Sequence, residues 1–151
     1  MDGALTLCEF VADALIVIMP ANRSRDWWKQ ALHDQQSARR NAEMGIYDWA
    51  CFMAQQAGEK AIRALVQHHG GDAWGHSVRE LAQLLPDGVA VPPDVRDALP
   101  VLDRYYIPTR YPNGIDSGTP ADTYGAQDAE TAVGLCEIVL RFVEGHLPGS
   151  G

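Results

Sequence analysis

The residue best suited to bind a phosphate group is Arg110, which lies in a segment that also carries Tyr105, Tyr106 and Tyr111. A guanidinium group can hold a phosphate through two parallel hydrogen bonds, and a tyrosine ring can stack on a nucleobase. The alternative is structural, because tyrosine side chains and Tyr-Pro turns commonly pack a loop against a helical domain. Arg110, Tyr106 and Tyr111 are therefore candidate phosphate- or nucleotide-binding residues, with the packing role left open.

A polar stretch interrupts an otherwise apolar helical segment at Gln55, Gln56, Glu59 and Lys60. Gln56 and Lys60 are four residues apart, so they lie on one face of a helix. Spacing alone favours a solvated face over a binding groove.

His76 stands directly before Ser77, where a helix is predicted to begin. Its ring could approach an anion bound at the free N–H groups of that helix, or it could cap the chain locally. His68 and His69 diverge by about 100° around a helix, and no two histidines have the four-residue spacing of a helical metal pair. We therefore predict no metal site and no other cofactor.

Helices must position these residues, because apolar side chains recur at helical spacing and no useful strand-period segment is present. We predict helices over about 24–44, 46–69, 77–85 and 126–147, and one from Pro92 that Pro100 should kink or interrupt. Ser24 is the expected N-cap of the first of these. Residues 107–125 form a long, turn-rich loop, and the ragged apolar residues from Leu5 to Ile18 permit an additional N-terminal helix. The predicted fold class is all-α.

Composition restricts the class of protein further. The chain has 151 residues, a net charge of -8 and three widely spaced cysteines. This length suits a single domain, the negative charge opposes delocalised binding to phosphate backbones, and the cysteines suggest neither a disulfide framework nor a zinc site. The most apolar stretch, Ala14 to Met19, is too short to cross a membrane, and the first ten residues lack the basic start of a secretory signal. We expect a cytoplasmic protein with no membrane contact.

Three segments carry a resemblance to the HEPN family, whose name refers to nucleotide binding in higher eukaryotes and prokaryotes. They comprise Trp27–Ala38 with Tyr47–Leu65, then Gly75–Val78 with Leu81 and Leu84-Leu85, and finally Leu102–Pro112. The resemblance implies an up-and-down bundle of four or five helices, with one short helix and a long loop before the last helix. It assigns residues 23–148 to the domain, leaves 1–22 as an N-terminal extension of uncertain structure, and moves Gln56 and Lys60 towards a binding groove.

The resemblance also implies function. Family members are often homodimers, and many are encoded beside a small nucleotidyltransferase as a two-component toxin–antitoxin pair. Our first hypothesis is a module that binds nucleotide or RNA as the partner of such an enzyme, through Arg110, Tyr106, Tyr111, Lys60, Gln56 and His76. A second hypothesis is a metal-independent endoribonuclease. A third is a non-catalytic interaction scaffold.

The ribonucleases of the family use an arginine followed by four to six residues and a histidine. Arg141 with His146, and Arg63 with His68 or His69, match this spacing. Arg141 is followed by Phe142 and lies near the end of the last helix, whereas the family motif has a polar residue next and lies near that helix's start. Arg141 and His146 are therefore weak catalytic candidates.

Overall fold

A computed structural model describes residues 22–149 of the chain. The described residues form six α-helices and no strand: α2 (Ser24–Glu43), α3 (Tyr47–His68), α4 (Val78–Ala82), α5 (Pro93–Asp103), α6 (Pro120–Thr123) and α7 (Ala126–Glu144), with a 3-10 turn, η1, at Pro112–Gly114. The all-α prediction is confirmed. The possible helix at Leu5–Ile18 lies outside the described residues.

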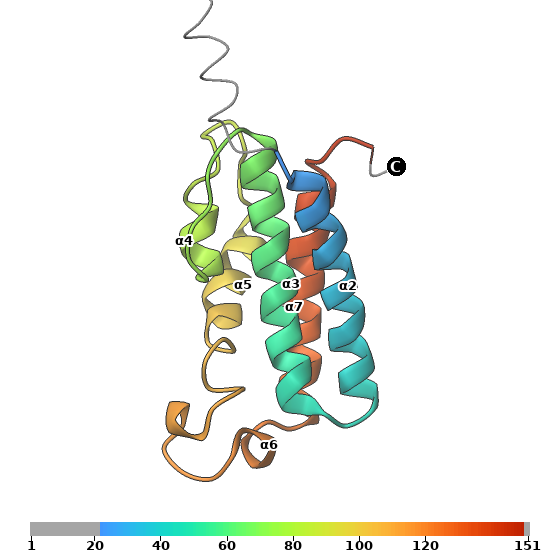
Figure 1. The fold of residues 1–151 in the computed structure, drawn as a ribbon, viewed down its shortest axis with the longest axis vertical. Helices are drawn as coiled ribbons and strands as arrows, with labels where there is room; N and C mark the ends of the chain where they lie inside the picture. Colours follow the sequence, from blue (N-terminus) through green and yellow to red (C-terminus); the bar gives the residue numbers. More distant parts are fainter. Residues whose placement is uncertain (1–21, 150–151) are drawn as a thin grey trace, which may run out of the picture.

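The four longer helices, α2, α3, α5 and α7, run up and down beside one another, and α4 lies against their upper half (Figure 1). Helix α3 is central, because it contacts α2, α4, α5, α6 and α7. Helix α6 and the loop around it lie beyond the lower end of the bundle (Figure 1). Gln56 and Lys60, two of the candidate site residues, therefore lie on the central helix of the bundle.

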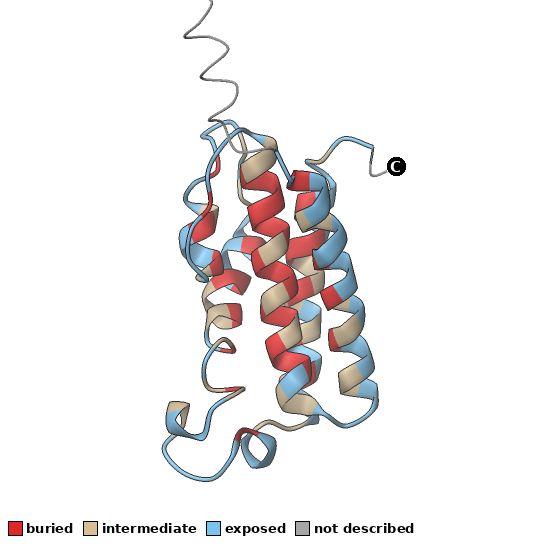
Figure 2. Cartoon of the chain, viewed as in Figure 1, coloured by how far each residue is buried: buried red, intermediate tan, exposed pale blue. Residues whose placement is uncertain are grey.

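Small side chains allow the other helices to approach α3 closely. Ala50, Ala54, Ala57, Ala61 and Ala64 are fully buried along it, and Figure 2 shows red residues over most of its length. A Cβ atom added at Gly58 would lie 3.1 Å from a methyl carbon of Leu102 on α5. Close packing of this kind makes even a methyl group at such a position costly.

The predicted N-cap of α2 is wrong, and of the two outcomes predicted at Pro100, a kink or an interruption, the interruption does not occur. The N-cap of α2 is Arg23 and not Ser24, whose backbone N–H donates to the side-chain oxygen of Asn22 at 3.0 Å. Helix α5 continues through Pro100 to Asp103 without a break. Proline removes the N–H that would bond to the carbonyl of Arg96, and Arg96 is an exposed residue.

Helix α4 is shorter than the predicted span of 77–85. Ser77 is its N-cap, and the Ser77 hydroxyl accepts from the backbone N–H of Glu80 at 3.2 Å. Asp103 at the end of α5 completes the cap, since its carboxylate accepts from the Ser77 hydroxyl at 2.7 Å and from the Val78 N–H at 2.6 Å. A residue 25 positions away in the chain therefore fixes where α4 begins.

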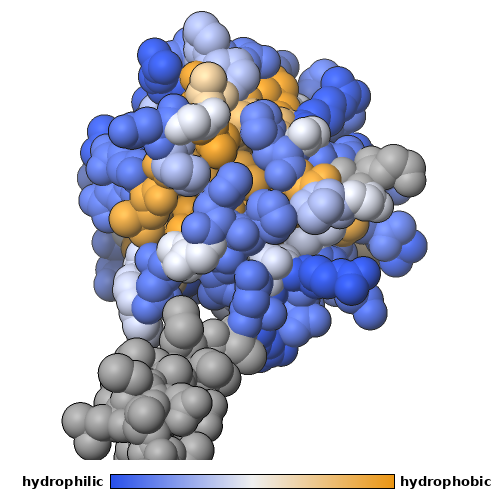
Figure 3. Space-filling model, turned by 90° about the horizontal axis from the view of Figure 1, so that it is seen from above, coloured by the Kyte–Doolittle hydropathy of each residue, from blue (hydrophilic) through white to orange (hydrophobic). Residues whose placement is uncertain are grey.

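The tryptophans contribute less to the core than aromatic residues usually do. Trp74 is 80% exposed and Trp49 is 44% exposed, while Trp27 and Trp28 are half-buried. Seen from the end where α3 and α7 finish, hydrophobic patches alternate with hydrophilic residues (Figure 3). No described helix is long and apolar enough to cross a membrane.

Candidate phosphate-binding site

Arg110 is held against a group of aromatic rings beside α3. Its guanidinium carbon lies 4.3 Å from the ring centroid of Phe52 on α3, 4.5 Å from that of Tyr106 and 5.0 Å from that of Tyr111. Its Nε donates to the carbonyl of Tyr106 at 2.8 Å. The two terminal nitrogens of the guanidinium have no hydrogen-bond partner within residues 22–149. The side chain is thus oriented while its bidentate edge stays available.

The neighbouring residues explain why this turn is ordered. Tyr105 is buried against Tyr124, with ring centroids 6.2 Å apart, and the buried hydroxyl of Thr109 donates to the Tyr105 carbonyl. Tyr106 consequently lies on the outer side of the turn, whereas Tyr105 anchors it. The structure therefore assigns packing to Tyr105, one of the three tyrosines considered for base stacking.

His76 lies in the loop between α3 and α4, which also borders this site. Its ring stacks on Tyr106 with centroids 4.8 Å apart and planes inclined by 17°. Its Nδ1 lies 3.3 Å from a carboxylate oxygen of Glu59 on α3. We call Phe52, His76, Tyr106, Arg110 and Tyr111 the Arg110 cluster. Four of its members, all except Phe52, were sequence candidates that the fold brings together from two separate loops.

Glu59 is the buried centre of a polar network that the sequence pattern did not reveal. The carboxylate forms an ion pair with Arg63 at 3.0 Å and accepts from the side-chain amides of Gln55 and Gln56. Gln55 is fully buried and Glu59 is 4% exposed, so the prediction of a solvated face is wrong for these two residues. The signal for burial was available, because alanines and Gly58 surround them on α3.

The other two candidates on α3 are bound within the protein. The ammonium group of Lys60 forms an ion pair with Asp34 on α2, and Asp34 is buried. The amide of Gln56 donates to Gln55 at 2.8 Å and to Glu59 at 3.3 Å. These contacts give Lys60 and Gln56 structural partners, and neither is placed in the Arg110 cluster by any observed contact. Asp34 was not among the sequence candidates.

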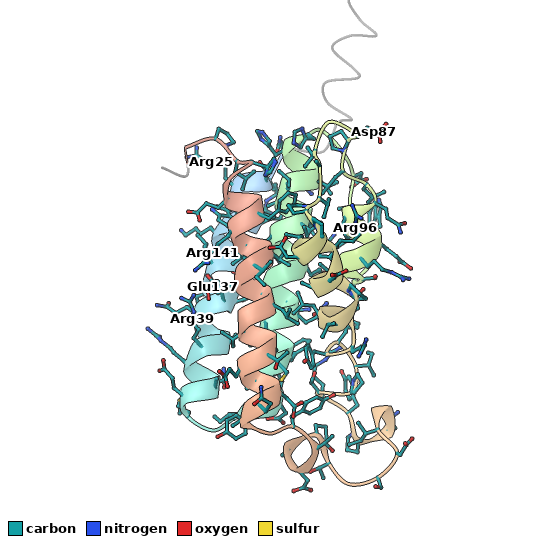
Figure 4. All side chains as sticks on the ribbon, turned by 180° about the vertical axis from the view of Figure 1, so that it is seen from behind. Arg25, Arg39, Asp87, Arg96, Glu137 and Arg141 are labelled. Atoms are coloured by element: carbon teal, nitrogen blue, oxygen red, sulfur yellow. The ribbon has the colours of Figure 1, made fainter. Side chains whose placement is uncertain are left out.

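Arg141 and His146 do not contact each other. Arg141 is 75% exposed and pairs with Glu137 at 2.5 Å, while Glu137 also lies 3.7 Å from Arg39. Figure 4 shows Arg39, Glu137 and Arg141 together along α2 and α7, on the back of the molecule relative to Figure 1. The Nδ1 of His146 lies 2.8 Å from the carbonyl of Phe142. The geometry is that of a surface ion pair and a local helix-end contact.

In the second arginine–histidine match, Arg63 also has structural partners and no observed contact with His68 or His69. Arg63 is buried, stacks at 4.9 Å on Trp27 and donates to the carbonyls of Ala73 and Gly75. His68 and His69 contact one another with ring centroids 5.1 Å apart, whereas the charged partner of Arg63 is Glu59. Arg63 therefore holds the 73–75 loop, which leads directly into His76.

The described thiols are poor nucleophiles. Burial, with smaller contributions from Asp128 and Asp48, raises the pKa of Cys51 to about 12. Burial likewise raises the pKa of Cys136 to about 12. A thiol with such a pKa is almost entirely protonated near neutral pH, and the thiolate is the reactive form. Within residues 22–149, no group of three or more histidine, cysteine or acidic side chains is arranged to hold a metal ion.

A cavity of about 830 Å³ lies next to the Arg110 cluster and shares Tyr106 with it. Its lining also includes Ile107, Ile115, Asp116 and Tyr124 from the long loop. Aromatic, apolar and acidic groups therefore line a hollow that borders Tyr106. A second cavity, of about 750 Å³, lies at the start of α2, far along the bundle from α6, and Trp28 and Lys29 help to line it.

Comparison with known proteins identifies the family. A crystal structure of TT1696 from Thermus thermophilus is 46% identical, with a TM-score of 0.81 over 84% of this chain and 100% of that chain. The archaeal HEPN homologue ST0689 is 35% identical, with a TM-score of 0.70 over 83% and 98% of the two chains. A HEPN domain protein from Thermotoga maritima is 33% identical, with a TM-score of 0.64 over 80% and 95%. A comparison with curated proteins gave no match.

The match to the family model extends over most of the bundle. The model of the HEPN domain matches residues 24–146, from the first residue of α2 to just beyond the end of α7. This match and the structural similarities confirm the resemblance seen in the sequence. The chain belongs to the HEPN domain family.

Proposed function

We propose that this protein binds the phosphate group of a nucleotide or of RNA at the Arg110 cluster. The observation that carries the proposal is the state of Arg110, whose Nε and aromatic contacts fix the guanidinium while both terminal nitrogens lack a partner among the described residues. Such an edge matches the two oxygens of a phosphate. Tyr111 is 48% exposed and offers a ring on which a base can stack.

The local balance of charge supports binding at this place. Lys60 is matched by Asp34, and Arg63 is matched by Glu59. Arg110 forms no ion pair among the described residues of a chain whose net charge is -8. Because long stretches of phosphate backbone require many cationic contacts, the proposed ligand is a nucleotide or a short single-stranded segment.

We also propose that the protein is a cytoplasmic homodimer that works with a small nucleotidyltransferase. Membership of the HEPN family supports this assignment, and exposed Trp49 and Trp74 provide apolar surface suited to protein contacts. We do not propose ribonuclease activity, because Arg141 is paired with Glu137 and does not contact His146.

The test is a binding titration with the four nucleoside 5′-monophosphates and with a mixed-sequence RNA octamer. Arg110→Ala should weaken binding at least about tenfold, since a charge-assisted hydrogen bond contributes roughly 1.5–3 kcal/mol. Arg110→Lys should also bind more weakly, because an ammonium group keeps the charge but lacks the planar fork.

Arg141→Ala is the matched control, since Arg141 is an exposed arginine of the α7 surface. We expect its affinity to equal that of the wild type. Equal affinity in Arg110→Ala would contradict the proposal. Sedimentation equilibrium of the same sample should give twice the mass of one chain, and RNA incubated with the protein in EDTA should be recovered uncleaved.

A further inference from the structure

His76 and Arg110 share one aromatic platform. The His76 ring centroid lies 4.8 Å from the centroid of the Tyr106 ring, and the guanidinium carbon of Arg110 lies 4.5 Å from the same point. The side chain of His76 is 60% exposed. The guanidinium and an accessible imidazole therefore both border the ring of Tyr106.

The protein fixes which nitrogen of that imidazole faces outward. Nδ1 lies 3.3 Å from Glu59, whose side chain is 5% exposed, so Nδ1–H is the natural donor to the buried carboxylate. The backbone carbonyl of His76 accepts from the amide of Gln55 at 3.1 Å, which holds the residue against α3. Nε2 has no partner in the part of the chain that the structure describes.

The charged groups around His76 are largely matched with one another. On α3, Glu59 pairs with Arg63, and at the end of α5 the carboxylate of Asp103 is used by Ser77 and Val78. The phenol of Tyr106 stacks on the imidazole, and Arg110 lies over the same phenol ring. Protonation of His76 would therefore add a second cation beside the charge of Arg110.

We propose that His76 is a second contact to the phosphate bound by Arg110, and that protonation of its imidazole strengthens binding as the pH falls from about 8 to about 6. Histidine is the side chain whose charge ordinarily changes in this range. This inference rests on the proposed function and adds to it a residue and a regulation by pH.

The test compares the affinity for one probe at about pH 6 and about pH 8. A mixed-sequence RNA octamer with hydroxyl ends is suitable, because its diester phosphates keep their charge over this range. We expect the wild type to bind about fivefold or more tightly at the lower pH, given the usual strength of a charge-assisted hydrogen bond. A parallel titration uses the nucleoside monophosphates. Comparing the two affinities shows whether the bound phosphate belongs to a free nucleotide or to RNA.

His76→Asn is the informative variant, because its amide can replace Nδ1–H at Glu59 but offers nothing in the place of Nε2. The ratio of affinities at the two pH values should fall to about one. His76→Gln serves as a second variant, and circular dichroism checks the fold of both. His69→Asn is the matched control, since His69 is exposed at the end of α3 and is expected to leave the ratio unchanged.

The outcomes separate the two proposals. An unchanged ratio in folded His76→Asn, or a ratio of one in the wild type, would overturn the role of His76. If the protein binds neither probe at either pH, the proposed function itself fails. Binding that Arg110→Ala abolishes but that does not depend on pH would leave the function intact and refute only this inference.

Discussion

At the scale of single residues, the candidate site depends on the carboxylate of Glu59, which the sequence did not single out as a binding residue. Glu59 is almost fully buried, yet it contacts Arg63, Gln55, Gln56 and His76. Removing one partner of a buried ion pair strongly destabilises the folded protein, because the other charge is then left without compensation. Glu59 therefore links the stability of α3 to the orientation of His76.

Replacing Glu59 with alanine should reduce the free energy of unfolding by about 3–5 kcal/mol, because Arg63 would remain buried without its carboxylate. Urea denaturation followed by circular dichroism measures this loss. Glu137→Ala is the comparison, since it breaks the pair with 75% exposed Arg141 and should cost less than about 1 kcal/mol. Similar losses in the two variants would show that burial does not control the contribution of Glu59.

At the scale of elements, the short helix α4 owes its position to α5. Five residues cannot form a stable helix alone, since helix formation begins with a costly first turn. Asp103 accepts from three donors at the start of α4, the Ser77 hydroxyl and the backbone N–H groups of Val78 and Arg79. Because His76 immediately precedes this cap, Asp103 also helps to place the Arg110 cluster.

Asp103→Ala should lower the free energy of unfolding by about 1–3 kcal/mol, since it removes a helix cap and leaves polar donors unpaired. Amide hydrogen exchange at Val78 and Arg79 should become faster than in the wild type. Asp97→Ala provides the control, because Asp97 is an exposed acidic residue of the same helix. Unchanged exchange in Asp103→Ala would contradict a capping role.

At the scale of the whole molecule, the burial of thiol and phenol groups makes the folded state less stable at alkaline pH. Desolvation raises the pKa of Cys51 and of Cys136 from 9.0 to about 12, and raises that of Tyr105 from 10.0 to about 12. The folded protein retains protons that the unfolded chain releases above about pH 9. The contribution of these groups to stability is therefore complete below about pH 9 and is lost as the pH rises towards about 12.

The free energy of unfolding should fall by about 2–3 kcal/mol between about pH 8.5 and about pH 10, since one unit of pKa shift corresponds to about 1.4 kcal/mol. Urea denaturation in reducing buffer measures the slope. A variant with Cys51→Ala and Cys136→Ala should lose most of it, even if its stability is lower at every pH. Cys8→Ser is introduced into both the reference protein and the double variant, so that the third thiol does not contribute. If the double variant showed the same slope of unfolding free energy against pH as the reference, the buried thiols would be excluded as its cause.

Much of the fold could be predicted from local features of the chain. Apolar periodicity predicted the four main helices, and Gly45 and Gly70 mark helix ends with φ of +77° and +79°. The sequence left open whether the helix continues through Pro100, because a proline's effect depends on whether the carbonyl it leaves unpaired can find another partner. The prediction of Ser24 as N-cap failed by one residue, because Ser24 is already helical and its N–H donates to the side chain of Asn22.

The sequence by itself determined the fold class and the family resemblance, and it singled out Arg110 as a candidate for holding a phosphate. Only the tertiary structure decided that Arg110 meets Phe52 of α3, that His76 stacks on Tyr106, and that Lys60 is paired with Asp34. Helical periodicity is a local property and can be read along the chain. Pairing and burial of charges depend on residues that folding brings together from distant segments, so the lack of an acidic partner for Arg110 among the described residues became visible only in three dimensions.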